Sequence, residues 1–283
     1  MAIKRLVDKN LLSPVRWLGA AGLLSAAMLA GCGGDQEAQD QILKVGTVAG
    51  PETEVMQVAA NRAKDEYGLD VKIVEFTDYV SPNAALADGS LDANAFQHEP
   101  YMVSMVEDRG YDFAIAGRTF VYPIGAYSEK YDSIEDLPDG ATIALPNDPS
   151  NEGRSLILMH DEGLIELKDP ENLEATPIDI AENPRNFKFR EIEAAQLPRV
   201  LQDVDMAFIN NTFAQPAGLS LDDALIKEGP DSPYVNLIVV REGDQEREAI
   251  RQLVSAYQSD EVAQKAEELF DGAAVPGWKD AAQ

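Results

Sequence analysis

Stretches typical of β-strands and α-helices alternate along almost the whole chain after residue 41. The first is a β-type run at 42–48, followed by a helical pattern at 54–67 and by an alternating run at 71–76. Apolar residues three and four positions apart share one helix face, whereas strict alternation is typical of a half-buried strand. This β–α–β opening predicts a parallel strand pair joined by a right-handed crossover.

The same alternation continues toward the C-terminus. We expect further strands at 91–95, 113–117, 121–127, 141–145, 165–167, 187–192, 207–209 and 236–240. We expect helices at 83–88, 100–109, 196–202, 214–217 and 247–270, and one that carries Ser155–Leu158. The pattern indicates an α/β fold with mostly parallel sheets. The roughly 240 residues after the N-terminal segment are more than a single hydrophobic core usually holds. We therefore predict two α/β lobes with a ligand cleft between them.

The N-terminal segment has the pattern of a secretory signal rather than of a folded element. A basic region precedes the apolar run Trp17–Ala30, which is shorter than the roughly 20 residues of a membrane-spanning helix. The run ends in the lipobox pattern Leu-Ala-Gly-Cys, and Cys32 is the only cysteine of the chain. We therefore predict a lipoprotein signal peptide at 1–31, lipidation of Cys32 and a flexible tether at 32–41. A secretory signal with an incidental cysteine is the alternative.

Composition excludes several classes of function. The chain has 23 Lys and Arg against 50 Asp and Glu, a formal net charge of −27, whereas binding to nucleic-acid phosphates needs clustered cations. A single cysteine excludes an internal disulfide framework, and two histidines leave little for a metal cluster. The sequence has no Gly-x-Ser-x-Gly, no phosphate-binding glycine loop and no His-Glu-x-x-His. We expect no catalysis, no cofactor, no metal and no nucleic acid.

An aromatic cluster at 94–101 (NAFQHEPY) is the first candidate site. It follows a strand and precedes a helix that starts with proline, and sheet ends that face a cleft are where ligand-binding loops gather. Phe96 and His98 alternate on one side of the chain, and Tyr101 lies one helical step further. With Tyr79 upstream, they can form the wall of a slot for an apolar side chain. Packing in the core is the alternative, and by composition alone the more frequent one.

A second candidate site lies at 146–155 (PNDPSNEGRS), where a strand ends and a helix begins. Free N–H groups and the positive end of the helix dipole favour an anion there. Arg154, in the first helical turn, can hold a carboxylate with two parallel hydrogen bonds. The alternative has Ser150 or Asn151 as an N-cap and Arg154 on the surface.

A third candidate set consists of Asn210 and Asn236, each at the edge of an apolar, strand-like run. An asparagine side chain offers both a donor and an acceptor. That combination suits the ammonium and carboxylate groups of an amino acid. Taken singly, each asparagine is more often a turn or cap residue.

These clusters and several other stretches resemble the NlpA lipoprotein family, the methionine-binding substrate receptors of ABC importers. The similarity covers 43–278 and is most specific at 93–101 (ANAFQHEPY), 146–155 (PNDPSNEGRS), 193–199 (EAAQLPR), 232–239 (SPYVNLIV), 256–262 (AYQSDEV) and 274–278 (AVPGW). The resemblance implies an α/β, two-lobed periplasmic-binding-protein-like fold of type II with the ligand cleft between the lobes. Lobe 1 would comprise 42–121 and 237–283, and lobe 2 would comprise 122–236.

The resemblance also implies a role for each candidate residue. Tyr79, Phe96, His98 and Tyr101 correspond to the pocket around the methionine thioether. Arg154 corresponds to the carboxylate clamp, with Asn151 beside it, and Asn210 and Asn236 correspond to the partners of the amino and carboxylate groups. Asn211 and Phe213 replace a Thr and a Tyr that the family pattern has beside the site, which puts fine specificity in doubt.

The implied function is a receptor that captures L-methionine and delivers it to an ABC importer, that is, to the permease and its ATPase. The receptor would be lipid-anchored in the cell envelope and would face the periplasm or the exterior. D-methionine or a close analogue is an alternative ligand. A receptor for another amino acid or for a methionine-containing dipeptide is a second alternative. The third alternative, from another class of function, is a lipoprotein enzyme or a surface adhesin that uses the same cleft, with His98 and Glu99 as the acid–base pair of the enzyme.

Overall fold

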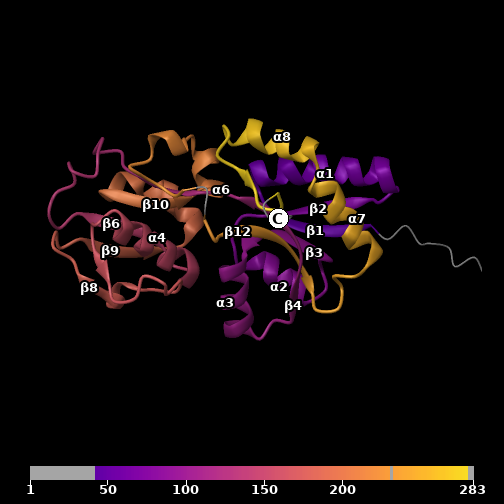
Figure 1. The fold of residues 1–283 in the computed structure, drawn as a ribbon, viewed down its shortest axis with the longest axis horizontal. Coiled ribbons are helices and arrows are strands. Elements are labelled where there is room, and N and C mark those ends of the chain that lie inside the picture. Colours follow the sequence, from indigo (N-terminus) through magenta and orange to yellow (C-terminus); the bar gives the residue numbers. More distant parts are fainter. Residues whose placement is uncertain (1–41, 230–231, 280–283) are drawn as a thin grey trace, which may run out of the picture. The chain divides into compact units, whose positions relative to one another are not determined.

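Two β-sheets organise the computed structural model, which describes residues 42–229 and 232–279 (Figure 1). The six-stranded sheet has the order β13 (Val275–Pro276), β4 (Phe113–Val121), β12 (Val235–Arg241), β3 (Ala93–His98), β1 (Leu43–Val48) and β2 (Val71–Phe76). The five-stranded sheet has the order β11 (Ile226–Lys227), β5 (Ile124–Tyr127), β10 (Met206–Asn210), β6 (Thr142–Pro146) and β9 (Lys188–Ile192). A separate short pair joins β7 (Glu166–Leu167) and β8 (Ile180–Glu182).

Helices cover both faces of the six-stranded sheet (Figure 1). One face carries α1 (Pro51–Tyr67), α7 (Glu248–Tyr257) and α8 (Asp260–Leu269), and the other carries α2 (Ser81–Ala87) and α3 (Glu99–Arg109). The five-stranded sheet is accompanied by α4 (Pro149–Asp161), α5 (Leu197–Val200) and α6 (Asn211–Ala214). Short 3₁₀ turns lie at Pro177–Asp179, Ala194–Gln196, Leu201–Asp203, Gln215–Ala217 and Leu221–Asp223.

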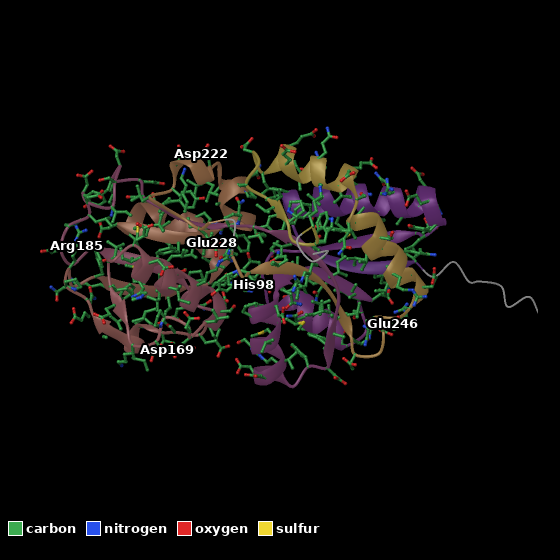
Figure 2. All side chains as sticks on the ribbon, viewed as in Figure 1. His98, Asp169, Arg185, Asp222, Glu228 and Glu246 are labelled. Carbon is green, nitrogen blue, oxygen red and sulfur yellow. The ribbon has the colours of Figure 1, made fainter. Side chains whose placement is uncertain are left out.

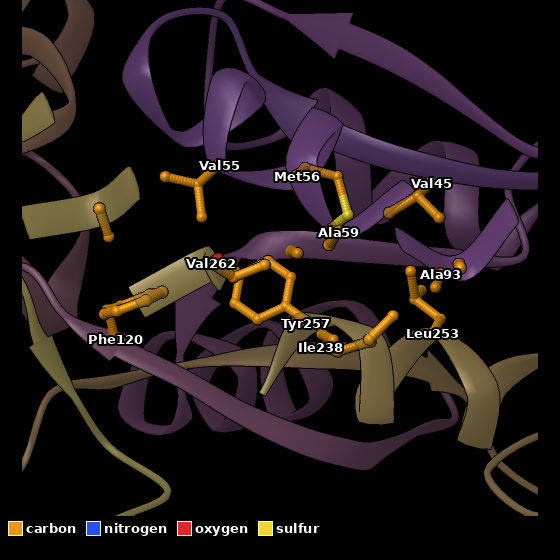
Figure 3. Close-up of a cluster of buried hydrophobic side chains, with 14 of the residues drawn as sticks. Val45, Val55, Met56, Ala59, Ala93, Phe120, Ile238, Leu253, Tyr257 and Val262 are labelled. Atoms are coloured by element: carbon orange, nitrogen blue, oxygen red, sulfur yellow. The ribbon is translucent and has the colours of Figure 1, made fainter. Parts of the chain in front are cut away.

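Each sheet has its own hydrophobic core. Under α1, the buried side chains of Val55, Met56 and Ala59 pack with residues of the sheet and of α7 and α8 (Figure 3). Leu156 of α4 belongs to a second cluster, built on β6 and β10. Residues 40–283 nevertheless group into one compact unit. The division into two lobes at 121/122 and 236/237 therefore stays a prediction.

Both sheets are mixed, so the expectation of mostly parallel strands was wrong. β1 is parallel to β2 and β3, and β6 is parallel to β9 and β10. β12 is antiparallel to β3 and β4, and β5 is antiparallel to β10 and β11. The reason is topological. The chain leaves the first sheet after β4 and returns to it as β12, so these neighbours run in opposite directions.

Several predicted element bounds need correction. The helix expected at 247–270 is two helices, because Ser259 adopts an extended conformation and its hydroxyl accepts a hydrogen bond from the N–H of Val262. Serine followed by two acidic residues favours a new helix start. The helix expected at 196–202 is only α5, flanked by 3₁₀ turns. The strand expected at 91–95 is β3, which ends later, at His98, and so includes two predicted site residues.

The predicted signal peptide at 1–31, Cys32 and the tether at 32–41 lie outside the described residues. Within the described part of the chain, each helix is too short or too polar to cross a membrane.

Candidate functional site

The eight ligand-binding residues predicted from the sequence all line one cavity. The lining also includes four residues that were not predicted, Gln97, Tyr122, Asn211 and Thr212. The six-stranded sheet supplies residues of β3 and β12, and the five-stranded sheet supplies the end of β10 and the helices α4 and α6. The cavity therefore lies between the two sheets.

Aromatic rings form the part of the cavity that comes from the six-stranded sheet. The ring centroids of Tyr79 and Phe96 are 5.8 Å apart, and those of Phe96 and Tyr101 are 6.0 Å apart with nearly perpendicular planes. Such edge-to-face contacts are favourable because the positive ring edge meets a negative ring face. The hydroxyl of Tyr101 donates to the carbonyl oxygen of Tyr79 at 2.8 Å, which ties the loop before α2 to α3. The rings thus hold one another in place.

His98 caps α3 and is held in one tautomer. The N–H of Tyr101 donates to its Nδ1 at 3.2 Å, which leaves the ring proton on Nε2, 3.3 Å from Oδ1 of Asn151. Burial and the nearby charge of Arg154 lower the pKa of His98 to about 3, so the ring is neutral. In the sheet, His98 pairs with Asn236, whose Nδ2 donates to the carbonyl oxygen of Phe96 at 3.1 Å.

Asp148 is the N-cap of α4, where the sequence had suggested Ser150 or Asn151. Its Oδ1 accepts hydrogen bonds from the backbone N–H and from Nδ2 of Asn151, both at 2.9 Å. An acceptor at this point fixes the orientation of the Asn151 amide. The oxygen of Asn151 therefore faces the opposite way, where it accepts from His98 and, at 2.8 Å, from Nδ2 of Asn210.

Asn210, at the end of β10, is left with an unused acceptor. Its Nδ2 is committed to Asn151, and its buried Oδ1 has no hydrogen-bond partner within the described residues. Buried polar atoms are nearly always paired, so an orphaned acceptor in a cavity wall indicates a donor that arrives with a ligand. A ligand ammonium group is one donor that can satisfy this oxygen.

Arg154 is buried, with 2% of its surface exposed, so the alternative with this residue on the surface is wrong. Its Nε donates to Oε1 of Glu228 at 2.8 Å, and its Nη2 donates to Oε2 of Glu228 and, at 3.1 Å, to the carbonyl oxygen of Tyr122. The two parallel hydrogen bonds expected for a ligand are thus made to Glu228. Within the described residues, Nη1 makes one long contact, 3.5 Å to Oδ1 of Asn151, and so has N–H capacity left for a ligand.

The network from His98 through Asn151 to Arg154 ends at Glu228, and Figure 2 labels both of its ends. The ring of Tyr234 supports the guanidinium, with its centroid 4.4 Å from Cζ of Arg154. Cations attract the electron-rich ring face, more strongly when both are shielded from water. The cation is therefore fixed by a carboxylate, a carbonyl and a ring before a ligand arrives.

A second buried carboxyl group links the elements of the two sheets. Glu52, in the first turn of α1, accepts a hydrogen bond from the hydroxyl of Thr212 on α6. Burial raises the pKa of Glu52 to about 8, although the hydrogen bond from Thr212 lowers it somewhat. The carboxyl group is therefore mostly protonated at neutral pH and adds little charge to the cavity.

Asp148 and Tyr234 lie inside stretches that the sequence had singled out, and Thr212 lies two residues after Asn210, but none of the three had a role of its own. Glu228 had no such signal. It is one of 50 acidic residues, and its partner Arg154 is 74 positions away in the sequence. Among the described residues, no group of three or more His, Cys, Asp and Glu side chains is placed to hold a metal ion.

Two mixed β-sheets with their helices, and a small polar and aromatic cavity between them, are the architecture of periplasmic substrate-binding proteins. A solved methionine-binding protein, MetQ, superimposes with a TM-score of 0.82 at 50% identity, covering 84% of this chain and 99% of its own. A nutrient-binding protein from Burkholderia cenocepacia, solved with methionine bound, superimposes with a TM-score of 0.81 at 51% identity, covering 83% and 100%.

The sequence comparisons agree with the structural ones. The D-methionine-binding lipoprotein MetQ of Escherichia coli is 50% identical over 259 residues, which cover 90% of this chain and 95% of that protein. The profile of the NlpA lipoprotein family matches residues 43–278. The chain belongs to the NlpA lipoprotein family, as the resemblance had predicted.

Proposed function

We propose that this protein is a receptor that binds methionine and delivers it to an ABC importer. The observation that carries the proposal is the unpaired Oδ1 of Asn210 in the same cavity as the partly free Nη1 of Arg154. Oδ1 of Asn210 accepts a hydrogen bond and Nη1 of Arg154 donates one, which suits an ammonium group and a carboxylate group, respectively. A free amino acid brings both charges on a single carbon, and this is the ligand chemistry that the polar side of the cavity fits.

The aromatic side of the cavity favours methionine among the amino acids. Its thioether is apolar and polarizable, and sulfur near a ring edge gains about 0.3–1.5 kcal/mol per contact. Tyr79, Phe96 and Tyr101 all line the cavity, and their rings are tilted or nearly perpendicular to one another. Burial of the side chain adds roughly 1.5–3 kcal/mol. Micromolar binding needs about −8 kcal/mol, so the aromatic and polar sides must act together.

The roles of the polar residues follow from the hydrogen bonds. Arg154 would bind the ligand carboxylate through Nη1, and Asn210 would accept from the ammonium group. Asn236 would contribute from β12, next to His98. Asn151 accepts from three neighbours and donates to Asp148, so it would act mainly by orienting Asn210 and His98.

The named relatives support the same ligand and leave its stereochemistry as a question for experiment. The Escherichia coli relative is named for D-methionine, and the Burkholderia cenocepacia neighbour was solved with methionine. Calorimetry on protein stripped of ligand by unfolding and refolding is expected to show one binding site for L-methionine. D-methionine is measured in the same way for comparison. The absence of heat with both ligands and with other short apolar amino acids would refute the proposal.

Another amino acid or a methionine-containing dipeptide is the competing ligand class. A dipeptide has its ammonium and carboxylate groups further apart than an amino acid has. Native mass spectrometry of freshly purified protein identifies whichever ligand co-purifies. A mass increment equal to methionine supports the proposal, and a dipeptide increment contradicts it.

We also infer a binding role rather than a catalytic one. Both ring nitrogens of His98 are engaged, one by the N–H of Tyr101 and the other by Asn151. A ring held in this way has no free position for taking up a substrate proton. An amino-acid derivative that wild-type protein turned over and His98→Ala did not would contradict this inference.

We further propose that Cys32 carries the lipid that anchors the protein to a membrane of the cell envelope, facing the periplasm or the exterior. The lipobox and the absence of other cysteines support this site. Labelled palmitate is expected to enter the wild-type protein and not Cys32→Ala. Equal labelling of both proteins would exclude Cys32.

A further inference from the structure

The carboxylate of Glu228 pairs with Arg154, the one formally charged residue among the described residues that line the cavity. Glu228 follows β11 directly and is 9% exposed. One of its oxygens accepts from Nε of Arg154 at 2.8 Å and the other accepts from Nη2. This two-point arrangement is the strongest pairing available to a guanidinium. Arg154 therefore meets a ligand as half of an ion pair and not as a free cation.

The other ionisable groups near the cavity do not replace this charge. Burial lowers the pKa of His98 to about 3 and raises that of Glu52 to about 8, so both are mostly neutral at pH 7. Asp148 is committed to the first turn of α4, where its Oδ1 accepts from Asn151 and Ser150. At that helix end, the dipole partly offsets a negative charge. The charge balance at the guanidinium is consequently set by Glu228.

Glu228 is also held firmly enough to keep its charge in a buried place. Its Oε2 accepts from the N–H of Ile124 at 3.2 Å, at the start of β5, and its Oε1 accepts from the hydroxyl of Ser232 at 2.9 Å. These two partners belong to the two segments through which the chain passes between the sheets. Buried charges persist only when they are paired and hydrogen-bonded, and Glu228 meets both conditions.

We propose that Glu228 determines the charge selectivity of the cavity, by making it accept a ligand with no net charge and reject a carboxylate that lacks an ammonium group. An unpaired guanidinium would attract any small carboxylate. Next to a neutral Arg154–Glu228 pair, a ligand carboxylate adds an uncompensated negative charge, unless the ligand brings its own cation to Asn210. The proposal rests on the proposed function, because it takes the ligand to be a free amino acid.

The test compares methionine with des-amino methionine, the carboxylate that has the same side chain and no ammonium group. Dissociation constants for both are measured by calorimetry in wild-type protein, Glu228→Gln and Glu228→Asp. Asp222→Asn is the matched control, because the side chain of Asp222 is 96% exposed and its loss changes the net charge by the same amount. The quantity of interest is the preference, that is, the ratio of the two dissociation constants.

Glu228→Gln is expected to reduce the preference for methionine by about tenfold or more, since hydrogen bonds and ion pairs with a charged group contribute more than those between neutral groups. The des-amino ligand should gain affinity in absolute terms. Glu228→Asp keeps the charge and should keep the preference, even if both ligands bind more weakly, and Asp222→Asn should change neither affinity.

Equal weakening of both ligands in Glu228→Gln would show that Glu228 only supports the fold, and would overturn the proposal. If Glu228→Gln does not fold, Glu228→Asp decides: a preserved preference supports the proposal, and a preference lowered tenfold despite the retained charge contradicts it. Wild-type protein that binds neither ligand refutes the proposed function instead. The two failures are therefore distinguishable.

Discussion

The two sides of the cavity differ in what they lack before a ligand arrives. On the aromatic side, Tyr79, Phe96 and Tyr101 contact one another, and the hydroxyl of Tyr101 has its partner in the carbonyl oxygen of Tyr79. On the polar side, Oδ1 of Asn210 has no partner within the described residues, and Nη1 of Arg154 has only a long contact there. The three rings are held by contacts with one another and by this hydrogen bond, whereas Asn210 and Arg154 keep hydrogen-bonding capacity for a ligand.

This difference indicates a division of labour. Side chains on the aromatic side stabilise the fold and offer apolar surface to many ligands of similar shape. In the proposed function, those on the polar side recognise the charges that distinguish an amino acid from other small molecules. Changes on the polar side should therefore alter which molecules bind. Changes to the ligand side chain should alter affinity by the smaller amounts typical of apolar contacts.

The largest effect is expected for Arg154→Ala. It removes the ligand clamp and leaves Glu228 as an unpaired buried charge, which typically costs 3–5 kcal/mol of folding free energy. Urea unfolding should show this loss, and calorimetry should show methionine binding weakened by more than about 2 kcal/mol. The double variant Arg154→Ala/Glu228→Gln is the control. It should recover much of the stability and none of the affinity, and near-wild-type affinity in either protein would show that the clamp is misassigned.

The second largest effect concerns the protonation of Glu52, the residue of α1 that accepts a hydrogen bond from Thr212 of α6. The pKa of Glu52 is raised from 4.5 to about 8 in the folded protein. The folded state therefore keeps a proton that the unfolded state has released. The contribution to stability is fully present below pH 4.5 and is lost as the pH rises through about 8. Between these two pH values, the free energy of unfolding of wild-type protein should fall by on the order of 2–4 kcal/mol relative to that of Glu52→Gln.

Urea unfolding of both proteins at several pH values measures this difference. The comparison cancels other groups that titrate in the same range, such as Glu152, whose pKa burial raises to about 7. It also cancels His98, whose lowered pKa has the opposite effect: that contribution is present above pH 6.5 and is lost as the pH falls toward 3. Parallel stability curves for wild-type protein and Glu52→Gln would show that Glu52 is not protonated in the folded state.

The third effect is expected for Asn210→Ala, which removes the unpaired acceptor from the polar side. Methionine should bind about 2 kcal/mol more weakly, because its ammonium group loses a hydrogen bond to a buried partner. Des-amino methionine should bind as it does to wild-type protein. Calorimetry with both ligands measures the difference. Equal weakening of the two would place the ammonium group elsewhere.

The sequence was sufficient to identify eight of the twelve residues that line the cavity, because residue type and position near element ends carry that information locally. Phe96 and His98 stand at the end of β3, and Arg154 stands in an asparagine-rich start of a helix. The family resemblance then gave each of them a role. The structure places all eight predicted residues around one cavity.

Two properties could not be predicted from local patterns. The pairing of Arg154 with Glu228 joins residues 74 positions apart, and no pattern marks one carboxylate among 50. The direction of β12 depends on how the chain returns from the other sheet, and short apolar strands look alike whether they are parallel or antiparallel. The break between α7 and α8 was different, since Ser259 and the two acidic residues after it are a visible signal for a helix start.

The smallest effect is expected on the aromatic side and is tested by changing the ligand. Norleucine replaces the sulfur of methionine by a methylene group and leaves both charged groups in place. It should bind only about 0.3–1.5 kcal/mol more weakly than methionine, the contribution typical of a sulfur–ring contact. Calorimetry of both ligands on wild-type protein and on Asn210→Ala sharpens the comparison of the two sides. The penalty for norleucine should be the same in both proteins, because the ring contacts among Tyr79, Phe96 and Tyr101 do not involve Asn210. A penalty that disappears in Asn210→Ala would show that the two sides are coupled, and would contradict the division of labour between them.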